Sequence, residues 1–195
     1  MAGKITFSKS CYNIGLTFGT RKGVAPLPQP LESYLDIEST GLYPAHNHIT
    51  VVGVYLTDGV QDRFAQLVGD NVTAENLLQA LQGASTIYTY NGTRFDLPFI
   101  RYRLGVDLAR MLTHCDLMFH CWRKNLYGGL KGVERQLGIC RQLHEVDGYE
   151  AVRLWWKYAN HDDKDALKRL LDYNREDVMN LTSLRQRLLP TPTRR

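Results

Sequence analysis

Cysteine is scarce in this chain and follows no recognisable pattern. There are four cysteines among 195 residues and no C-x-x-C spacing. The sequence therefore predicts neither a disulfide framework nor a thioredoxin-like redox centre. Two adjacent His–Cys pairs offer a zinc site as an alternative, although we favour buried thiols and surface imidazoles. The residues concerned are His114, Cys115, His120 and Cys121, with Cys11 and Cys140 standing alone.

Long hydrophobic runs are also absent. The longest apolar run, over residues 49–56, is far shorter than the roughly 20 residues that a helix needs to span a bilayer. No apolar segment of the kind found in secretory signals follows Met1. We therefore expect a cytoplasmic protein without a membrane partner.

A strong charge of one sign is missing as well, because 24 basic and 20 acidic residues leave a formal net charge of +4. The small excess is uneven: residues 97–157 hold ten basic and six acidic side chains, whereas residues 1–96 hold six and eight. A basic rim beside an acidic site suits nucleic-acid phosphates, although an ordinary solvated surface explains any single member equally well. The main members are Arg101, Arg103, Arg110, Arg123, Lys124, Lys131 and Arg135.

The chain shows no internal repeat and no second domain, and its length fits one domain with a proper core. Residues 1–30 form an N-terminal extension that ends in a proline-rich connector, to which we assign no role. Residues 31–189 form the domain, and residues 190–195 form a tail that begins with a helix-ending proline.

Periodicity predicts an α/β fold. We expect strands at 33–39, 48–56, 61–67, 84–90 and 112–118, and helices at 73–82, 95–104, 129–137, 150–159 and 163–188, with a possible bend near Asn174 in the last. Three strands in succession before the first helix indicate an antiparallel meander, and the later strands would add in parallel. The result is a mixed five-stranded sheet with helices on both faces and the first strand at its centre.

The most informative feature is a pair of acidic residues in YLDIESTGLYP. Asp36 and Glu38 lie two apart on a predicted strand, so they point to one face while Leu35 and Ile37 point to the other. Neighbouring carboxylates raise each other's pKa unless a cation neutralises them, and hard divalent cations prefer oxygen ligands. A strand with a merely solvated outer face is the alternative.

A second acidic residue pattern occurs in YNGTRFDLPF. The strand-like run ends at the turn-forming pair Asn91-Gly92, and Asp96 then stands at the start of a predicted helix. An anion is favoured at a helix N-terminus. Taken alone, Asp96 is more often a helix cap than a metal ligand.

A third pattern, YNREDVMNL, lies on the last predicted helix. Tyr173 and Asp177 are four residues apart and share one helix face. Tyr173 alone would suit the edge of a core. The order D-x-E, N-G-x-x-F-D and Y-x-x-x-D makes a joint functional interpretation stronger than any of the three alone.

These segments resemble the three exonuclease motifs of the DEDD superfamily, in its tyrosine-containing DEDDy subclass. The proofreading domains of family-B DNA polymerases are similar, as are bacterial stand-alone proteins predicted to be exonucleases. The likeness covers residues 33–189 and includes weaker blocks such as HCDLMF, LKGVERQLGI and DGYEAVRLW. It implies a ribonuclease H-like fold and a 3′→5′ exonuclease that releases nucleoside 5′-monophosphates, with two Mg²⁺ or Mn²⁺ ions as cofactors.

The resemblance also assigns roles to residues. It makes Asp36, Glu38, Asp96 and Asp177 the metal ligands, and Tyr173 the residue that orients the attacking water. Two cations about 3.5–4 Å apart activate water and stabilise the leaving oxygen. The implied substrate is a single-stranded 3′ end, with DNA favoured over RNA. The substrate contacts would be Thr40, Gly41 and Leu42, with Leu42 as a wedge against the last base, and also Asn91 and Phe95.

Two functional alternatives remain at this point. The first is an RNase H-like endonuclease or resolvase, which the pairing of Tyr173 with Asp177 disfavours. The second is a non-catalytic nucleic-acid-binding module. Among the tryptophans, helical spacing predicts that Trp155 is buried and that Trp156 is the better candidate for stacking on a base.

Overall fold

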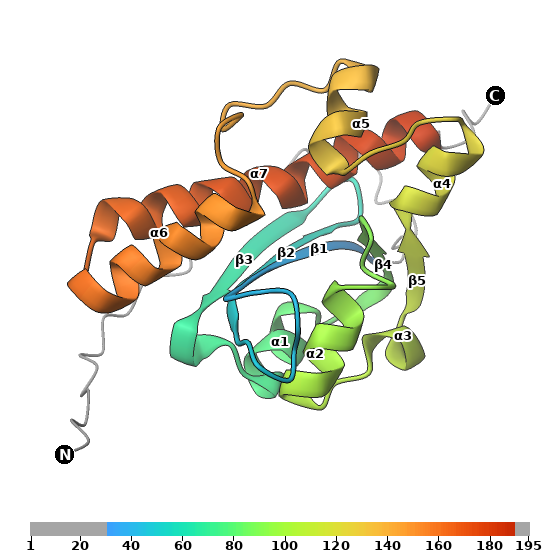
Figure 1. The fold of residues 1–195 in the computed structure, drawn as a ribbon. Helices are drawn as coiled ribbons and strands as arrows, with labels where there is room; N and C mark the ends of the chain where they lie inside the picture. The colour runs from blue at the N-terminus through green and yellow to red at the C-terminus, as the bar shows by residue number, and fades with distance from the viewer. Residues whose placement is uncertain (1–30, 190–195) are drawn as a thin grey trace.

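The computed structural model describes residues 31–189 (Figure 1). The predicted N-terminal extension and C-terminal tail lie outside the described residues. Within the described range, no helix is long and apolar enough to cross a membrane.

A five-stranded sheet forms the centre of the domain, in the order β3-β2-β1-β4-β5. Strand β1 pairs antiparallel with β2, and β2 with β3, whereas β4 joins β1 in parallel and β5 joins β4 in parallel. The predicted mixed sheet is therefore confirmed, with the acidic strand at its centre. The strands are β1 Leu31–Ser39, β2 Ile49–Thr57, β3 Asp62–Val68, β4 Ala84–Thr89 and β5 Thr113–Asp116.

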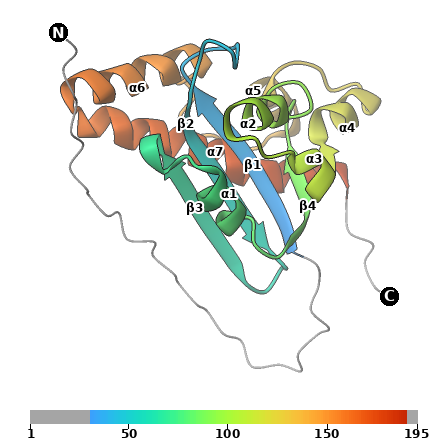
Figure 2. The same ribbon diagram turned by 90° about the horizontal axis from the view of Figure 1, so that it is seen from below.

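Helices cover both faces of this sheet. Helices α1 (Ala74–Ala80) and α2 (Asp96–Leu104) lie on one face, and α6 (Gly148–His161) and α7 (Lys164–Leu188) lie on the other (Figures 1 and 2). Helix α7 is continuous through Asn174 and crosses β1 and β2. Helix α5 (Leu130–Leu137) packs on α7 near the acidic end of β1.

Three short helical segments were not predicted: the 3₁₀ helix η1 (Gly69–Asn71), α3 (Leu108–Met111) and α4 (Leu117–Arg123). The strand predicted at 112–118 is wrong at its end. Asp116 stops the strand because its side chain accepts a hydrogen bond from Met118 N and so caps α4. Short helices of this kind have too few turns to show a clear period.

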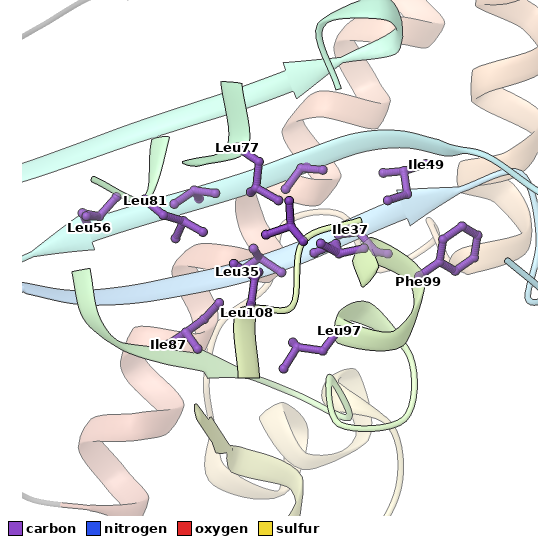
Figure 3. Packing of buried hydrophobic residues seen from close by; sticks show 14 residues of the cluster. Leu35, Ile37, Ile49, Leu56, Leu77, Leu81, Ile87, Leu97, Phe99 and Leu108 are labelled. Carbon is purple, nitrogen blue, oxygen red and sulfur yellow. The ribbon is translucent and has the colours of Figure 1, made fainter. Parts of the chain in front are cut away.

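The two faces of β1 are sorted as the sequence predicts. Leu35 and Ile37 point into a core formed with α1 and α2 (Figure 3). On the opposite face, Val51 of the neighbouring strand packs with Leu170 and Tyr173 of α7. Asp36 and Glu38 alternate with the core residues and therefore face α7.

Candidate metal centre

Three of the four predicted acidic residues converge. Asp36 and Glu38 from β1 and Asp177 from α7 each offer a carboxylate oxygen, and these oxygens lie within 4.8 Å of one another. Among the described residues this is the one group of three or more potential metal-ligating side chains. The arrangement arises because α7 crosses the central strand at the point where its two carboxylates face outward.

Asp96 lies beside this cluster on the other side of the β1 backbone. It begins α2 and is almost fully buried, and its Oδ1 accepts a hydrogen bond from Ile37 N at 3.1 Å. Its negative charge is close enough to raise the pKa of both Asp36 and Glu38. Asp96 thus ties the start of α2 to the strand that carries the other two acids.

The four carboxyl groups are held in an environment that disfavours their charge. Burial raises the pKa of Asp96 to about 7 and that of Asp177 to about 6. Burial, and then the charge of Asp177, raises the pKa of Asp36 and Glu38 well above their usual range. A divalent cation would remove this penalty, and a set of clustered carboxylate oxygens is the donor set that such ions prefer. The residues present therefore fit a hard metal ion.

Tyr173 lies at the edge of the cluster, one helical turn before Asp177. Its hydroxyl is hydrogen-bonded to Asp177, and burial followed by the neighbouring carboxylates raises the pKa of the phenol. Lys131 Nζ stands 4.9 Å from the ring centroid and the Arg141 guanidinium 5.7 Å from it. The phenol is therefore neutral, and it is a hydrogen-bonding group rather than a base.

Sequence reasoning missed Asn174, the residue that positions Asp36. Asn174 is fully buried, and its amide nitrogen donates to Asp36 Oδ2 at 3.1 Å and to the Asp36 carbonyl at 3.2 Å. Gln66 Nε2 in turn donates to Asn174 Oδ1 at 2.9 Å. The N of the YNRED pattern was the available signal, since asparagine is an uncommon residue at a buried helix position.

Sequence reasoning also missed a buried arginine. Arg141 is 5% exposed, and its guanidinium donates to both oxygens of Glu134, at 2.7 and 2.8 Å, and to Asp177 Oδ1. Glu134 additionally accepts a hydrogen bond from Asn180 at 3.0 Å. A single basic residue after the α5 helix carries no sequence signal of this role, because only the fold places it against Asp177.

Asp116 organises the turn that leads to Asp96. Asn91 has the left-handed φ of 64°, and its N–H donates to Asp116 Oδ1 at 2.8 Å while Thr93 N donates to Oδ2 at 3.0 Å. Gly92 packs so closely on Thr89 that a Cβ would lie 2.2 Å from Oγ1. The HCDLMF block therefore supports the second motif from a neighbouring strand.

The predicted substrate contacts lie around the same end of the sheet. Thr40 N donates to the His48 carbonyl at 2.9 Å, and Thr40 Oγ1 accepts from His48 N at 3.0 Å, so the loop between β1 and β2 is closed at its base. Within it, Gly41 lies against Asn47 and Leu42 is 73% exposed. Phe95 is half-buried and makes an edge contact with Phe99, 5.6 Å between centroids.

Other predicted candidates are dispersed. Arg101 and Arg110 both pair with Asp107, which explains them as surface ion pairs. Cys115 Sγ lies 3.4 Å from His120 Nε2, but among residues 31–189 no His/Cys group of metal-binding size forms there. Trp156 is exposed as predicted, whereas Trp155 is only half-buried rather than buried, because it packs at the margin of the α6–α7 core.

Comparison with known proteins places this geometry in a family. A family model described as the RNase_H superfamily matches residues 33–189. The uncharacterized protein YprB of Bacillus subtilis is 30% identical over 166 residues, which cover 77% of this chain and 40% of YprB. The chain thus spans well under half the length of this relative.

Solved structures share the fold. The family B DNA polymerase of Pyrobaculum calidifontis superposes with a TM-score of 0.66 at 18% identity, covering 87% of this chain and 26% of the polymerase. NrnC of Brucella melitensis, solved bound to pGG, superposes with a TM-score of 0.53 at 20% identity, covering 80% of this chain and 72% of NrnC. At these identities the likeness establishes the ribonuclease H-like fold.

Proposed function

The chain belongs to the RNase H superfamily, and from that premise we propose that it is a metal-dependent 3′→5′ exonuclease of the DEDDy type. One observation carries the proposal: carboxylates from β1 and α7 converge within 4.8 Å beside a tyrosine hydroxyl that is bonded to one of them. The proposed products are nucleoside 5′-monophosphates, released one at a time from a single-stranded 3′ end.

In this proposal Asp36, Glu38, Asp96 and Asp177 hold two Mg²⁺ or Mn²⁺ ions. When bound, such ions activate water and stabilise the leaving 3′ oxygen. The protein contributes the arrangement of the donors. Asn174 fixes Asp36 by one carboxylate oxygen, Ile37 N fixes one oxygen of Asp96, and the guanidinium of Arg141 fixes one oxygen of Asp177.

Tyr173 has a separate role. Its neutral hydroxyl stands among the acidic groups and is able to hold a water molecule in line with a scissile phosphate, without taking its proton. The Thr40–Leu42 segment would lie against the terminal nucleotide, with exposed Leu42 as a wedge, while Asn91 and Phe95 border the strand. Lys131 adds positive charge beside the site, which lowers the pKa of Glu38.

The nucleic-acid partner rests on the same reasoning. The Brucella NrnC structure contains pGG, and the polymerase that shares the fold is named for its action on DNA. We propose single-stranded nucleic acid as the substrate of this domain, with DNA favoured over RNA.

The test is digestion of 5′-labelled single-stranded DNA and RNA by the purified protein with Mg²⁺ or Mn²⁺. A 3′→5′ exonuclease shortens the labelled strand stepwise, and a 3′-phosphate blocks it. Early release of the label as a mononucleotide would contradict the polarity. Cleavage of a circular strand would favour an endonuclease or resolvase. Metal binding by calorimetry without any hydrolysis would favour a non-catalytic binding module.

A further inference from the structure

A second feature lies at the end of the sheet next to the acidic cluster. A cavity of about 390 Å³ opens where the loop after β1, the start of β2, η1, the end of α2 and α6 meet. Its wall combines residues that pack with the α1–α2 core, such as Leu104 and Val72, with Trp155 of the α6–α7 core. The cavity is therefore located where the two helical layers meet beyond the strand ends.

A β-bulge turns one strand residue into this wall. Glu38 pairs with Val51 but Ser39 pairs with Ile49, so Thr50 is an extra residue in β2. The bulge lets Ile49 join the same core as Val52, although strict alternation would put them on opposite faces. Bulges beside functional sites commonly re-aim a side chain, and here the re-aimed residue is Thr50, which lines the cavity.

The hydroxyl of Thr50 is unpaired. Thr50 is 1% exposed, and its Oγ1 has no hydrogen-bond partner among the described residues. A buried hydroxyl without a partner destabilises a protein, so an orphan hydroxyl in a cavity wall requires an explanation. A ligand group that reaches the cavity would supply the missing partner.

The remaining wall indicates what kind of ligand that is. Trp155 and Trp156 offer indole surfaces, and Trp156 is 46% exposed. Arg103 lines the cavity and contacts His48, while Asp70 adds a carboxylate that can accept hydrogen bonds. Flat aromatic surfaces with a few polar groups and an adjacent cation match a nucleobase with its attached phosphate.

The position relative to the acidic cluster supports the same ligand. Val51, the residue directly after Thr50, is the pairing partner of Glu38, and directly opposed residues in an antiparallel pair lie about 5 Å apart. Thr40, another wall residue, follows Glu38 by two positions. The cavity therefore begins within about one residue of the carboxylate cluster.

We propose that this cavity binds one nucleobase of the substrate strand, with stacking on Trp156, a hydrogen bond to the Thr50 hydroxyl and a phosphate near Arg103. The proposal rests on the proposed nuclease function and adds a base subsite to it. It makes the enzyme sensitive to the presence of a base at one defined position from the 3′ end.

Thr50→Val and Trp156→Leu test the subsite. The probe is a fluorescein-labelled oligothymidylate with an abasic unit at the last, second-last or third-last position, and binding is followed by anisotropy with Ca²⁺. For the wild type, one abasic position weakens binding by about 5- to 100-fold. Thr50→Val weakens binding of the intact strand by about 3- to 10-fold, and Trp156→Leu abolishes most of the penalty at that position.

The matched control is Thr57→Val, the same substitution at the opposite end of β2, where Thr57 Oγ1 accepts a hydrogen bond from Gly59 N. It leaves strand affinity unchanged. Thr50→Val melts at or above the wild-type temperature, because it removes an unpaired hydroxyl. A lower melting temperature would assign the hydroxyl to folding and overturn the proposal.

The subsite and the nuclease function fail in different ways. If the wild type digests the strand but both variants keep its affinity and its abasic penalty, the subsite is wrong and the nuclease function stands. If the wild type neither digests nor binds single strands, the nuclease function fails and the subsite fails with it.

Discussion

The missing side chain of Gly53 makes room for Asn174. Gly53 pairs with Asp36 across the central strands, and a Cβ at Gly53 would lie 2.3 Å from Asn174 Oδ1 and 2.8 Å from Val178 Cγ2. Because both Asn174 and Val178 are buried in α7, neither can move away easily. The glycine therefore allows α7 to approach the sheet closely enough for Asn174 to bind Asp36.

Gly53→Ala should lower the free energy of unfolding by about 1–3 kcal/mol, because it overpacks a filled core. It should also reduce nuclease activity, since Asn174 can no longer hold Asp36. Denaturant unfolding and single-turnover digestion measure the two effects. The control is Gly148→Ala at the start of α6, where a Cβ meets nothing within 4 Å. Equal stability of the Gly53 and Gly148 variants would contradict the close approach.

Arg141→Met should destabilise the protein by about 3–5 kcal/mol, because it leaves Glu134 buried without its cation. Adding Glu134→Gln should restore much of the stability, since both charges are then absent. Nuclease activity should stay low in the double variant, because Asp177 has lost its donor. Denaturant unfolding of the three variants forms the cycle. Failure of Glu134→Gln to restore any stability would refute the pairing.

Asp36→Asn and Asp177→Asn should both abolish hydrolysis but differ in metal-free stability. Asp36 has an amide partner and several like charges around it, so its neutralisation should raise the melting temperature. Asp177 accepts from Arg141, so its neutralisation should not raise it. Thermal melts in EDTA make the comparison. Retained activity of either variant in Mg²⁺ would contradict the metal assignment.

Stability without metal should fall between pH 5 and pH 8. The folded-state pKa is about 7 for Asp96 and about 6 for Asp177, both above the reference value of roughly 3.9. The folded state therefore binds protons more tightly than the unfolded state, and this stability is lost as pH rises through 6 and 7. Each unit of elevation corresponds to about 1.4 kcal/mol.

Melting temperatures in EDTA across this range test the pH dependence. Saturating Mg²⁺ at pH 8 should restore much of the loss, because the cation replaces the protons. A metal-free protein that is more stable at pH 8 than at pH 5 would be inconsistent with the buried acidic cluster.

Tyr173→Phe should separate positioning from metal binding. It keeps the ring between Lys131 and Arg141 and removes only the hydroxyl. The single-turnover rate should fall by about 10- to 1000-fold, or roughly 1.4–4 kcal/mol of transition-state stabilisation, while metal and strand affinities change little. An unchanged rate would make Tyr173 a packing residue. An equal loss of metal affinity would make it a support for Asp177 instead.

The sequence alone determined the sheet, its central strand and the sorting of β1. Strict alternation is a local property, so Leu35 and Ile37 predict the core face and Asp36 and Glu38 the opposite one without knowledge of the rest of the fold. The spacing of Tyr173 and Asp177 on one helix is local in the same way. These local patterns were sufficient to nominate the acidic residues, three of which the structure brings together.

Only the tertiary structure decided what surrounds those residues. Arg141 lies 36 positions from Asp177, Asn174 lies 138 positions from Asp36, and the bulge at Thr50 depends on the pairing of two strands. Contacts between residues so far apart have no period to reveal them. Their identity depends on how closely α7 approaches the sheet, and that distance is set by packing at Gly53 rather than by any local pattern.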